Sequence, residues 1–396
     1  MHTRFLLLPL ATCAASLALS GSTIGYFQTN LVSNGAVPAN VIDPDLKNPW
    51  GISFGPTTPF WVADNGTGLS TLYAGDGTKQ GLVVTIPPAP GSAIGTLGTP
   101  TGTVFNSTPG NFFGDRFLFA TEAGTIAGWQ AALGTTANVR ADNSGSGAVY
   151  KGLAIAGGNI YATDFAGNKI DVWTNGYTSP SLAAGAFTDP NLPDGFAPFG
   201  IQNIGGSLYV TYAKKQPGGD DDVAGPGFGI VDKYDTNGTL LQRVINPGGA
   251  LNSPWGLALA PAGFGDLSGL LLVGNFGDGT INSFDPTTGM FVSSLNDHGG
   301  SPIVIDGLWG LAFGNGGPGF DQHKLYFTAG LNDEEDGLFG AIAPVPEPGT
   351  MLLIGLSFSI LLLPRRKKSG LCAAAYHYAN KRGNYLNIVV EQDHRR

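Results

Sequence analysis

The chain has 396 residues, of which 62 are glycine, and charged residues make up only 12% of it. Residues 21–344 hold 11 Lys and Arg against 26 Asp and Glu, a net charge of −15, which argues against nucleic-acid binding because phosphate contacts need a basic face. Both cysteines, Cys13 and Cys372, lie outside that segment, which excludes an internal disulfide or a thiolate metal site within it.

Residues 1–20 have the pattern of a secretory signal peptide. Arg4 precedes the apolar run 5–10, and small residues follow up to Ser20. We expect signal peptidase to cut near Ser20–Gly21 and the body, residues 21–344, to be exported.

The body contains a repeat, in which a glycine opens an apolar strand. The opening glycines are Gly51, Gly102, Gly152, Gly200, Gly256 and Gly310, spaced by 51, 50, 48, 56 and 54 residues. A second apolar stretch follows in every unit, at 60–64, 116–120, 159–164, 207–211, 270–274 and 324–328. These stretches are short and rich in aromatic and β-branched residues, so we predict strands.

Third and fourth strands are expected after these, joined by turns rich in Asp, Asn and Gly such as 73–77, 234–238 and 284–289. Strands at 82–86 and 291–295 are examples of the fourth. Four antiparallel strands in six repeats predict an all-β fold, a six-bladed β-propeller.

The last repeat has three obvious strands, at 309–313, 324–328 and 337–342, whereas 26–32 is a spare strand at the start of the body. We predict that 26–32 supplies the outer strand of the last blade and closes the ring, because closure removes an exposed sheet edge.

The residues before the opening glycines are expected near one mouth of the central channel. They are Trp50, Thr101, Lys151, Phe199, Trp255 and Trp309. The large aromatic rings are compatible with a platform for a sugar ring, with Lys151 beside it. The other interpretation, which we favour, is that they pack neighbouring blades together.

Carboxylates recur where the second strands end, notably Asp64, Glu122 and Asp164. Carboxylate and amide oxygens are ligands that hard cations such as Ca²⁺ prefer, and Asn65, Asn275 and Asn332 lie near the ends of strands as well. Asp and Asn also favour turns, which is the simpler interpretation. Catalysis has little support, since the body has only His298 and His323 and no G-x-S-x-G motif.

The C-terminal region combines three features of a sorting signal at 345–368. A Pro-Glu-Pro cluster resists regular structure, the apolar run 351–363 is able to enter a bilayer, and four cations follow it. The residues that carry the pattern are Val345, Pro346, Glu347, Pro348, Thr350, Arg365, Arg366, Lys367 and Lys368. This succession resembles the PEP-CTERM signal, which implies a transmembrane helix and processing by an exosortase.

The body also resembles a family of exported bacterial proteins. The resemblance rests on N-P-W-G-I-x-F at 48–54, A-D-N-G at 63–66, S-P-W-G-L-A at 253–258 and the PEP-CTERM end. More distantly, the blades are similar to NHL-type and gluconolactonase-like propellers. This resemblance implies a divalent-cation site in the channel, with Ca²⁺ as the candidate ion, and its candidate ligands are Asp64, Asn65, Glu122, Asp164, Asn275 and Asn332. Residues 369–396 form a tail that PEP-CTERM proteins normally lack.

These patterns predict an exported propeller that serves as a ligand-binding or surface-associated module. It would be anchored to the membrane by its C-terminal helix, then released to the envelope or matrix, with an extracellular polysaccharide as a candidate partner. The alternative is a metal-dependent lactonase or related hydrolase that works in the channel.

Overall fold

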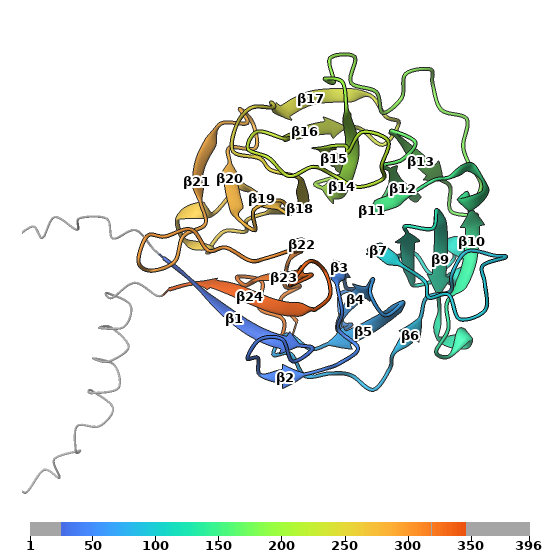
Figure 1. Ribbon diagram of the computed structural model, residues 1–396, viewed down its shortest axis with the longest axis horizontal. Coiled ribbons are helices and arrows are strands. Elements are labelled where there is room, and N and C mark those ends of the chain that lie inside the picture. The colour runs from blue at the N-terminus through green and yellow to red at the C-terminus, as the bar shows by residue number, and fades with distance from the viewer. Residues whose placement is uncertain (1–24, 318, 346–396) are drawn as a thin grey trace, which may run out of the picture. The chain divides into compact units, whose positions relative to one another are not determined.

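A computed structural model describes residues 25–317 and 319–345, which fold into six β-sheets arranged as blades around a central axis (Figure 1). The predicted six-bladed propeller is therefore confirmed. The expectations for 1–20, for 346–368 and for the tail 369–396 lie outside the described residues. Within the described residues, no helix is long and apolar enough to cross a membrane.

The first three blades follow one another along the chain. Blade 1 contains β3 (Pro49–Ser53), β4 (Phe60–Asp64), β5 (Leu69–Tyr73) and β6 (Val84–Thr85). Blade 2 contains β7 (Pro100–Phe105), β8 (Phe117–Thr121), β9 (Thr125–Trp129) and β10 (Asn138–Asp142). Blade 3 contains β11 (Tyr150–Ala156), β12 (Asn159–Asp164) and β13 (Lys169–Trp173). Short 3-10 turns η1 (Phe112–Gly114), η2 (Ala131–Leu133) and η3 (Ser144–Ser146) lie between strands of this half.

The other blades complete the ring. Blade 4 contains β14 (Phe196–Ile204), β15 (Ser207–Lys214), β16 (Gly229–Tyr234) and β17 (Leu240–Ile245). Blade 5 contains β18 (Pro254–Leu259), β19 (Leu271–Asn275), β20 (Ile281–Phe284) and β21 (Phe291–Ser294), with the turn η4 (Gly265–Leu267). Blade 6 contains β22 (Leu308–Phe313), β23 (Leu325–Ala329) and β24 (Leu338–Pro344).

The ring closes through the N-terminal strand, as predicted. Strand β1 (Tyr26–Ser33) pairs antiparallel with β24, from Tyr26 opposite Pro344 to Ser33 opposite Leu338. The two-residue strand β2 (Val41–Ile42) adds a parallel edge outside it. Figure 1 shows β1 and β24, the blue and orange ends of the fold, lying side by side. The last blade is therefore made from both ends of the body.

Blade 3 differs from the prediction of four strands in every unit. Its sheet has three strands, and residues 174–195 form turns and irregular structure where a fourth strand was expected. Pro180, Pro190 and Pro193 fall in this segment. Proline lacks the N–H that a sheet ladder needs, which explains the missing strand.

The opening glycines bring the inner strands of neighbouring blades into close contact around the axis. A Cβ built on any of the six would lie no more than 3.0 Å from the backbone of the next blade's inner strand. Gly310 closes the cycle, because its Cβ would lie 2.6 Å from the carbonyl oxygen of Trp50. The repeat exists because a side chain at this position would push adjacent blades apart.

Threonine side chains also connect some of the neighbouring blades. Thr101 Oγ1 donates to the Tyr150 carbonyl oxygen at 2.8 Å, and Thr163 Oγ1 donates to that of Phe199 at 2.6 Å. Apolar clusters fill the six spaces between blades, and a seventh cluster lies on the axis.

Candidate functional site

The predicted mouth aromatics form a buried cluster on the axis, here called the axial cluster. Trp50 and Trp309 stack with their ring centroids 3.6 Å apart, and Phe276 stacks on Trp309 at 4.1 Å. Trp255 meets both tryptophans edge-on, and Phe199 lies 5.9 Å from Trp309. Trp50, Phe199 and Trp309 are at most 2% exposed and Trp255 is 9% exposed.

The rings therefore cover one another and join blades 1, 4, 5 and 6 at the axis. This is the blade-packing role that the sequence favoured. A sugar platform needs an open ring face, so ligand binding by these rings stays a prediction.

Lys151 is the only charged residue among the six positions that precede the opening glycines, and it is almost fully buried. Its Nζ lies 2.7 Å from Glu122 Oε1, 3.2 Å from Asp221 Oδ1 and 5.2 Å from the ring centroid of Trp50. Burial would lower the pKa of Lys151, but the two carboxylates outweigh burial and raise this pKa. Lys151 thus stays a cation in a site built by blades 2, 3 and 4 and the axial cluster.

Amide side chains extend this ion pair into a network. Asn65 Nδ2 donates to Glu122 Oε2 at 2.9 Å, and Asn48 Nδ2 donates to Glu334 Oε2 at 2.7 Å and weakly to Asn65 Oδ1 at 3.5 Å. Trp309 Nε1 donates to Asn48 Oδ1 at 3.1 Å. Asn48, Asn65, Glu122, Lys151, Asp221 and Glu334 are here called the Lys151 mouth.

Five non-glycine residues in or beside this mouth have a left-handed backbone conformation. Asn48 and Ser253 have φ of 42° and 47°, and the loop Asn332–Glu334 has φ of 54°, 54° and 68°. Such left-handed conformations cost about 1–3 kcal/mol each for residues other than glycine, and they often occur where a chain positions functional groups.

Glu334 of the mouth and Asp222 beside it are carboxyl groups with altered acidity. Burial is the main cause of the raised pKa of both Asp222 and Glu334. The hydrogen bond from Asn48 lowers the pKa of Glu334, whereas the charges of Glu122 and Asp221 raise it. The mouth thus contains more acidic groups than its one lysine neutralises.

The candidate metal ligands do not converge in the part of the chain that the structure describes. Asp64 is fully buried, its Oδ2 accepts the Thr71 N–H at 2.8 Å, and burial raises its pKa well above the ordinary value. Asp164 Oδ1 accepts the N–H groups of Val149 and Gly167 at 3.1 and 2.9 Å.

Only Glu122 of the predicted set joins the Lys151 mouth through its carboxylate, with Asn65 as its amide partner. Asn275 accepts from the Asn252 N–H, and Asn332 donates to Asp336. Within 25–317 and 319–345, no three His, Cys, Asp or Glu side chains are grouped closely enough to hold a metal ion. In the described residues, the side chains predicted to form a metal site therefore do not come together. Asp64 and Asp164 instead accept hydrogen bonds from nearby backbone N–H groups.

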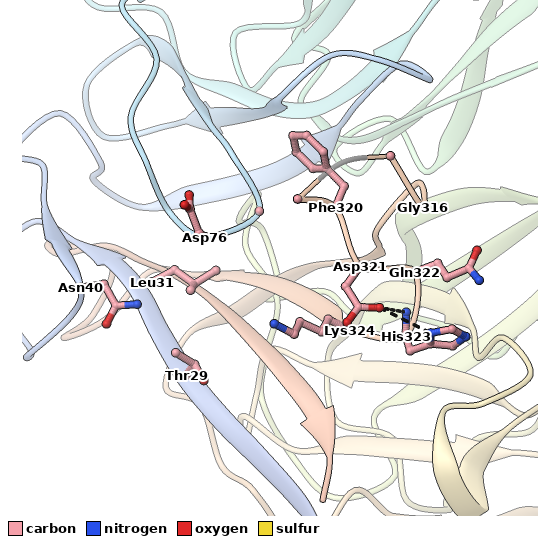
Figure 2. Close-up of a pocket in the computed structure, with 13 residues that line it drawn as sticks. Thr29, Leu31, Asn40, Asp76, Gly316, Phe320, Asp321, Gln322, His323 and Lys324 are labelled. Carbon is pink, nitrogen blue, oxygen red and sulfur yellow. Dashed lines mark hydrogen bonds and ion pairs between the residues drawn. The ribbon is translucent and has the colours of Figure 1, made fainter. Parts of the chain in front are cut away.

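A separate cavity of about 680 Å³ lies beside the ring closure, between β1, the turn at Gly75 and Asp76, and the loop 315–324 (Figure 2). His323, one of the two body histidines, lines it; its backbone N–H donates to Asp321 Oδ1 at 2.9 Å, and its Nδ1 lies 3.4 Å from the same oxygen. Residue 318, which belongs to this loop, is outside the described residues.

Comparison with known proteins gives two extended matches. An uncharacterized protein of Acanthamoeba polyphaga mimivirus is 36% identical over 330 residues, which cover 79% of this chain and 78% of that protein. A second uncharacterized mimivirus protein is 34% identical over 325 residues, which cover 79% of this chain and 84% of that protein. The chain belongs to the same family as these viral proteins. Their similarity does not bear on the predicted PEP-CTERM signal or bacterial origin.

No protein-family model matches the chain. Among solved structures, a streptogramin B lyase has 13% identity and a TM-score of 0.47, with 82% of this chain and all of that chain covered. A glucose dehydrogenase has 13% identity and a TM-score of 0.49, with 81% of this chain and 99% of that chain covered. We infer no activity from either.

Three residues of the Lys151 mouth were not predicted from the sequence. Asn48, Asp221 and Glu334 come from loops of three different blades, and the acidic runs 220–222 and 333–336 have the composition of solvated loops. The left-handed Asn48, three residues before the opening glycine Gly51, was the one local signal, because Asn tolerates positive φ better than most residues.

Proposed function

We propose that the protein is an exported binding module that holds a polysaccharide rich in hydroxyl or amino groups at the Lys151 mouth. The observation that carries this proposal is the buried Lys151, fixed by Glu122 and Asp221 from two other blades. Burying a cation is costly unless it is paired, and buried charged groups with perturbed pKa values cluster at functional sites.

The side chains of the mouth are held in place but keep capacity for a ligand. Each carboxylate oxygen offers two lone pairs, and the contacts of Glu122 and Glu334 with Lys151, Asn65 and Asn48 use only part of them. Glu122 is 28% exposed and Asp221 is 75% exposed, so both are accessible to solvent. Fixed, accessible acceptors suit the hydroxyl and amino donors of a sugar polymer.

The charge of the mouth selects among polymers. The single cation Lys151 is surrounded by four carboxyl groups, those of Glu122, Asp221, Asp222 and Glu334. The body as a whole has a net charge of −15. An anionic polysaccharide would be repelled, whereas a neutral or amino polysaccharide would not be. We therefore favour an amino-sugar polymer.

Delivery to the cell exterior is a further part of the proposal. Residues 1–20 would direct export, 345–368 would recruit an exosortase, and the apolar run would anchor the protein until it is processed. The Val345 N–H donates to the Gly25 carbonyl oxygen at 2.9 Å, so the two ends of the body leave the same blade. A cut near Ser20 would keep β1, and with it the closed ring, intact.

The test is retention of the full-length protein on immobilised amino, neutral and anionic polysaccharides. We compare Glu334→Gln with Glu335→Gln, because Glu334 accepts a hydrogen bond from Asn48 of the network, whereas its neighbour Glu335 is exposed. A hydrogen bond to a charged group contributes about 1.5–3 kcal/mol, so Glu334→Gln should weaken retention at least about tenfold.

Glu335→Gln should be retained like the wild type. Equal retention of both variants on the amino polymer would contradict binding at the mouth. Hydrolysis of a lactone that needs added Ca²⁺ would instead favour the hydrolase alternative.

A further inference from the structure

The opposite mouth of the central channel holds a cavity of about 500 Å³ to which all six inner strands contribute. Its lining comes from 52–54, 103–105, 154–155, 202–205, 257–259 and 311–313, here called the funnel. We propose that the funnel binds one uncharged, mostly apolar small molecule. This inference is independent of the polysaccharide proposal, because the two sites lie at opposite ends of the inner strands.

The funnel is blind, since its inner end meets the axial cluster. A smaller void of about 30 Å³ shares Ile52, Thr103 and Leu311 with the funnel and is also lined by Trp255. Trp255 has the largest exposed fraction among the four mouth aromatics. A ligand in the funnel would therefore approach an indole ring at the floor and be enclosed by strands on every side.

The lining chemistry identifies the class of ligand. None of the residues of the funnel is Asp, Glu, Lys, Arg or His. A charged ligand would lose its hydration there without an ionic partner, which is strongly unfavourable. Ten of the 18 lining residues are Ile, Leu, Val or Phe, and apolar side chains also dominate typical sites for small molecules.

The polar groups of the funnel are few and mostly paired. Ser53 Oγ and Thr103 Oγ1 are 3.0 Å apart, and Asn203 donates to the Ile155 carbonyl oxygen at 2.8 Å. Within the described residues, the exposed side-chain amide of Gln202 makes no hydrogen bond to the protein. Gln202 can thus orient a ligand that carries a single hydroxyl or carbonyl group.

Size and exposure favour a small molecule over a protein partner. A volume of about 500 Å³ falls within the usual range of small-molecule sites, about 300–1,000 Å³. The apolar Leu259 is 43% exposed, whereas Gln202 and Asn203 bring polar groups to the same lining. A concave apolar site with polar groups beside it matches a compact ligand that enters the funnel.

The experiment titrates the full-length protein with N-phenyl-1-naphthylamine, an uncharged apolar fluorophore. The wild type should bind one probe per chain. Leu259→Asp, which places a charge in the lining at an exposed position, should weaken binding at least tenfold. Ala312→Phe, which fills part of the funnel, should do the same. The matched control is Leu241→Asp, because Leu241 is 52% exposed on the outer strand β17 and should bind like the wild type.

The proposal is overturned if the wild type binds no probe, or if Leu259→Asp and Leu241→Asp bind it equally well. It is also overturned if the anionic 1-anilinonaphthalene-8-sulfonate binds as tightly as the uncharged probe. Thermal melts of each variant establish that it is folded, and Leu259→Asp gives a clear result even if Ala312→Phe does not fold.

Discussion

The opening glycines give the sharpest test of how the blades are held together. We predict that Gly310→Ala destabilises the protein, because the new Cβ would lie 2.6 Å from the Trp50 carbonyl oxygen and 2.8 Å from Thr328 Oγ1. The first atom belongs to the backbone of the neighbouring inner strand, which cannot rotate away. The strands must instead separate by several tenths of an ångström at the point where blade 6 meets blade 1.

The expected magnitude follows from two opposing effects. Overpacking costs about 3 kcal/mol at the upper end of its usual range. Replacing glycine by alanine recovers about 0.4–1 kcal/mol by restricting the unfolded chain. The net loss is about 2 kcal/mol. Because the entropy of unfolding is about 2.1 cal/mol/K per residue, this loss lowers the melting temperature by about 3 °C in a domain of this size.

A graded series makes this prediction stringent. At Gly152 the nearest backbone atom would be 3.0 Å from the Cβ, so Gly152→Ala should cost clearly less. At Gly176 nothing lies within 4 Å, so Gly176→Ala should be neutral or slightly stabilising. None of the three has a left-handed φ, so alanine fits each backbone. Equal melting temperatures by differential scanning calorimetry for all three variants would refute the role of the glycines.

Three further predictions concern closure, the axial cluster and pH. Deleting residues 26–33 should lower the melting temperature, because β24 loses its partner β1; an unchanged melt would disprove closure. Trp309→Ala should lower the free energy of unfolding, measured in urea, by about 3–5 kcal/mol, since it removes a fully buried ring that stacks on Trp50 and Phe276. A loss below about 1 kcal/mol would contradict this packing. Burial raises the pKa of Asp232, beside Tyr212, Tyr234 and Arg243, to about 7. Between about pH 4 and about pH 7 the folded protein therefore keeps a proton on Asp232 that the unfolded chain has lost. The contribution of Asp232 to the free energy of unfolding should fall over this range by at most about 4 kcal/mol. Asp232→Asn should remove that part of the pH dependence, and identical pH profiles for variant and wild type would contradict the assignment.

The propeller fold could be predicted from the sequence because the repeated glycine is needed for steric reasons. Each opening glycine is required by the backbone of the next blade, so the spacing of these glycines reports the blades directly. The spare strand 26–32 was placed correctly for a related reason, since the last blade lacked one strand. The missing strand of blade 3 was not foreseen, although Pro180, Pro190 and Pro193 carried the information.

The candidate site was less predictable because it depends on loops from different blades. The position of Lys151 before its glycine indicated the mouth, but nothing local to Asp221 or Glu334 shows that these residues reach the same mouth. Strand-end carboxylates gave a misleading signal: Asp64 and Asp164 accept backbone N–H groups nearby, a role that looks identical in sequence to a metal ligand.

The most direct test of the proposed function is isothermal titration of the full-length protein with a soluble amino-sugar oligomer, for the wild type and Glu122→Gln. The proposal predicts one site per chain in the wild type and affinity at least about tenfold lower in the variant, because Glu122 accepts from both Lys151 and Asn65. Binding of equal strength in both proteins, or no binding by the wild type, would contradict it.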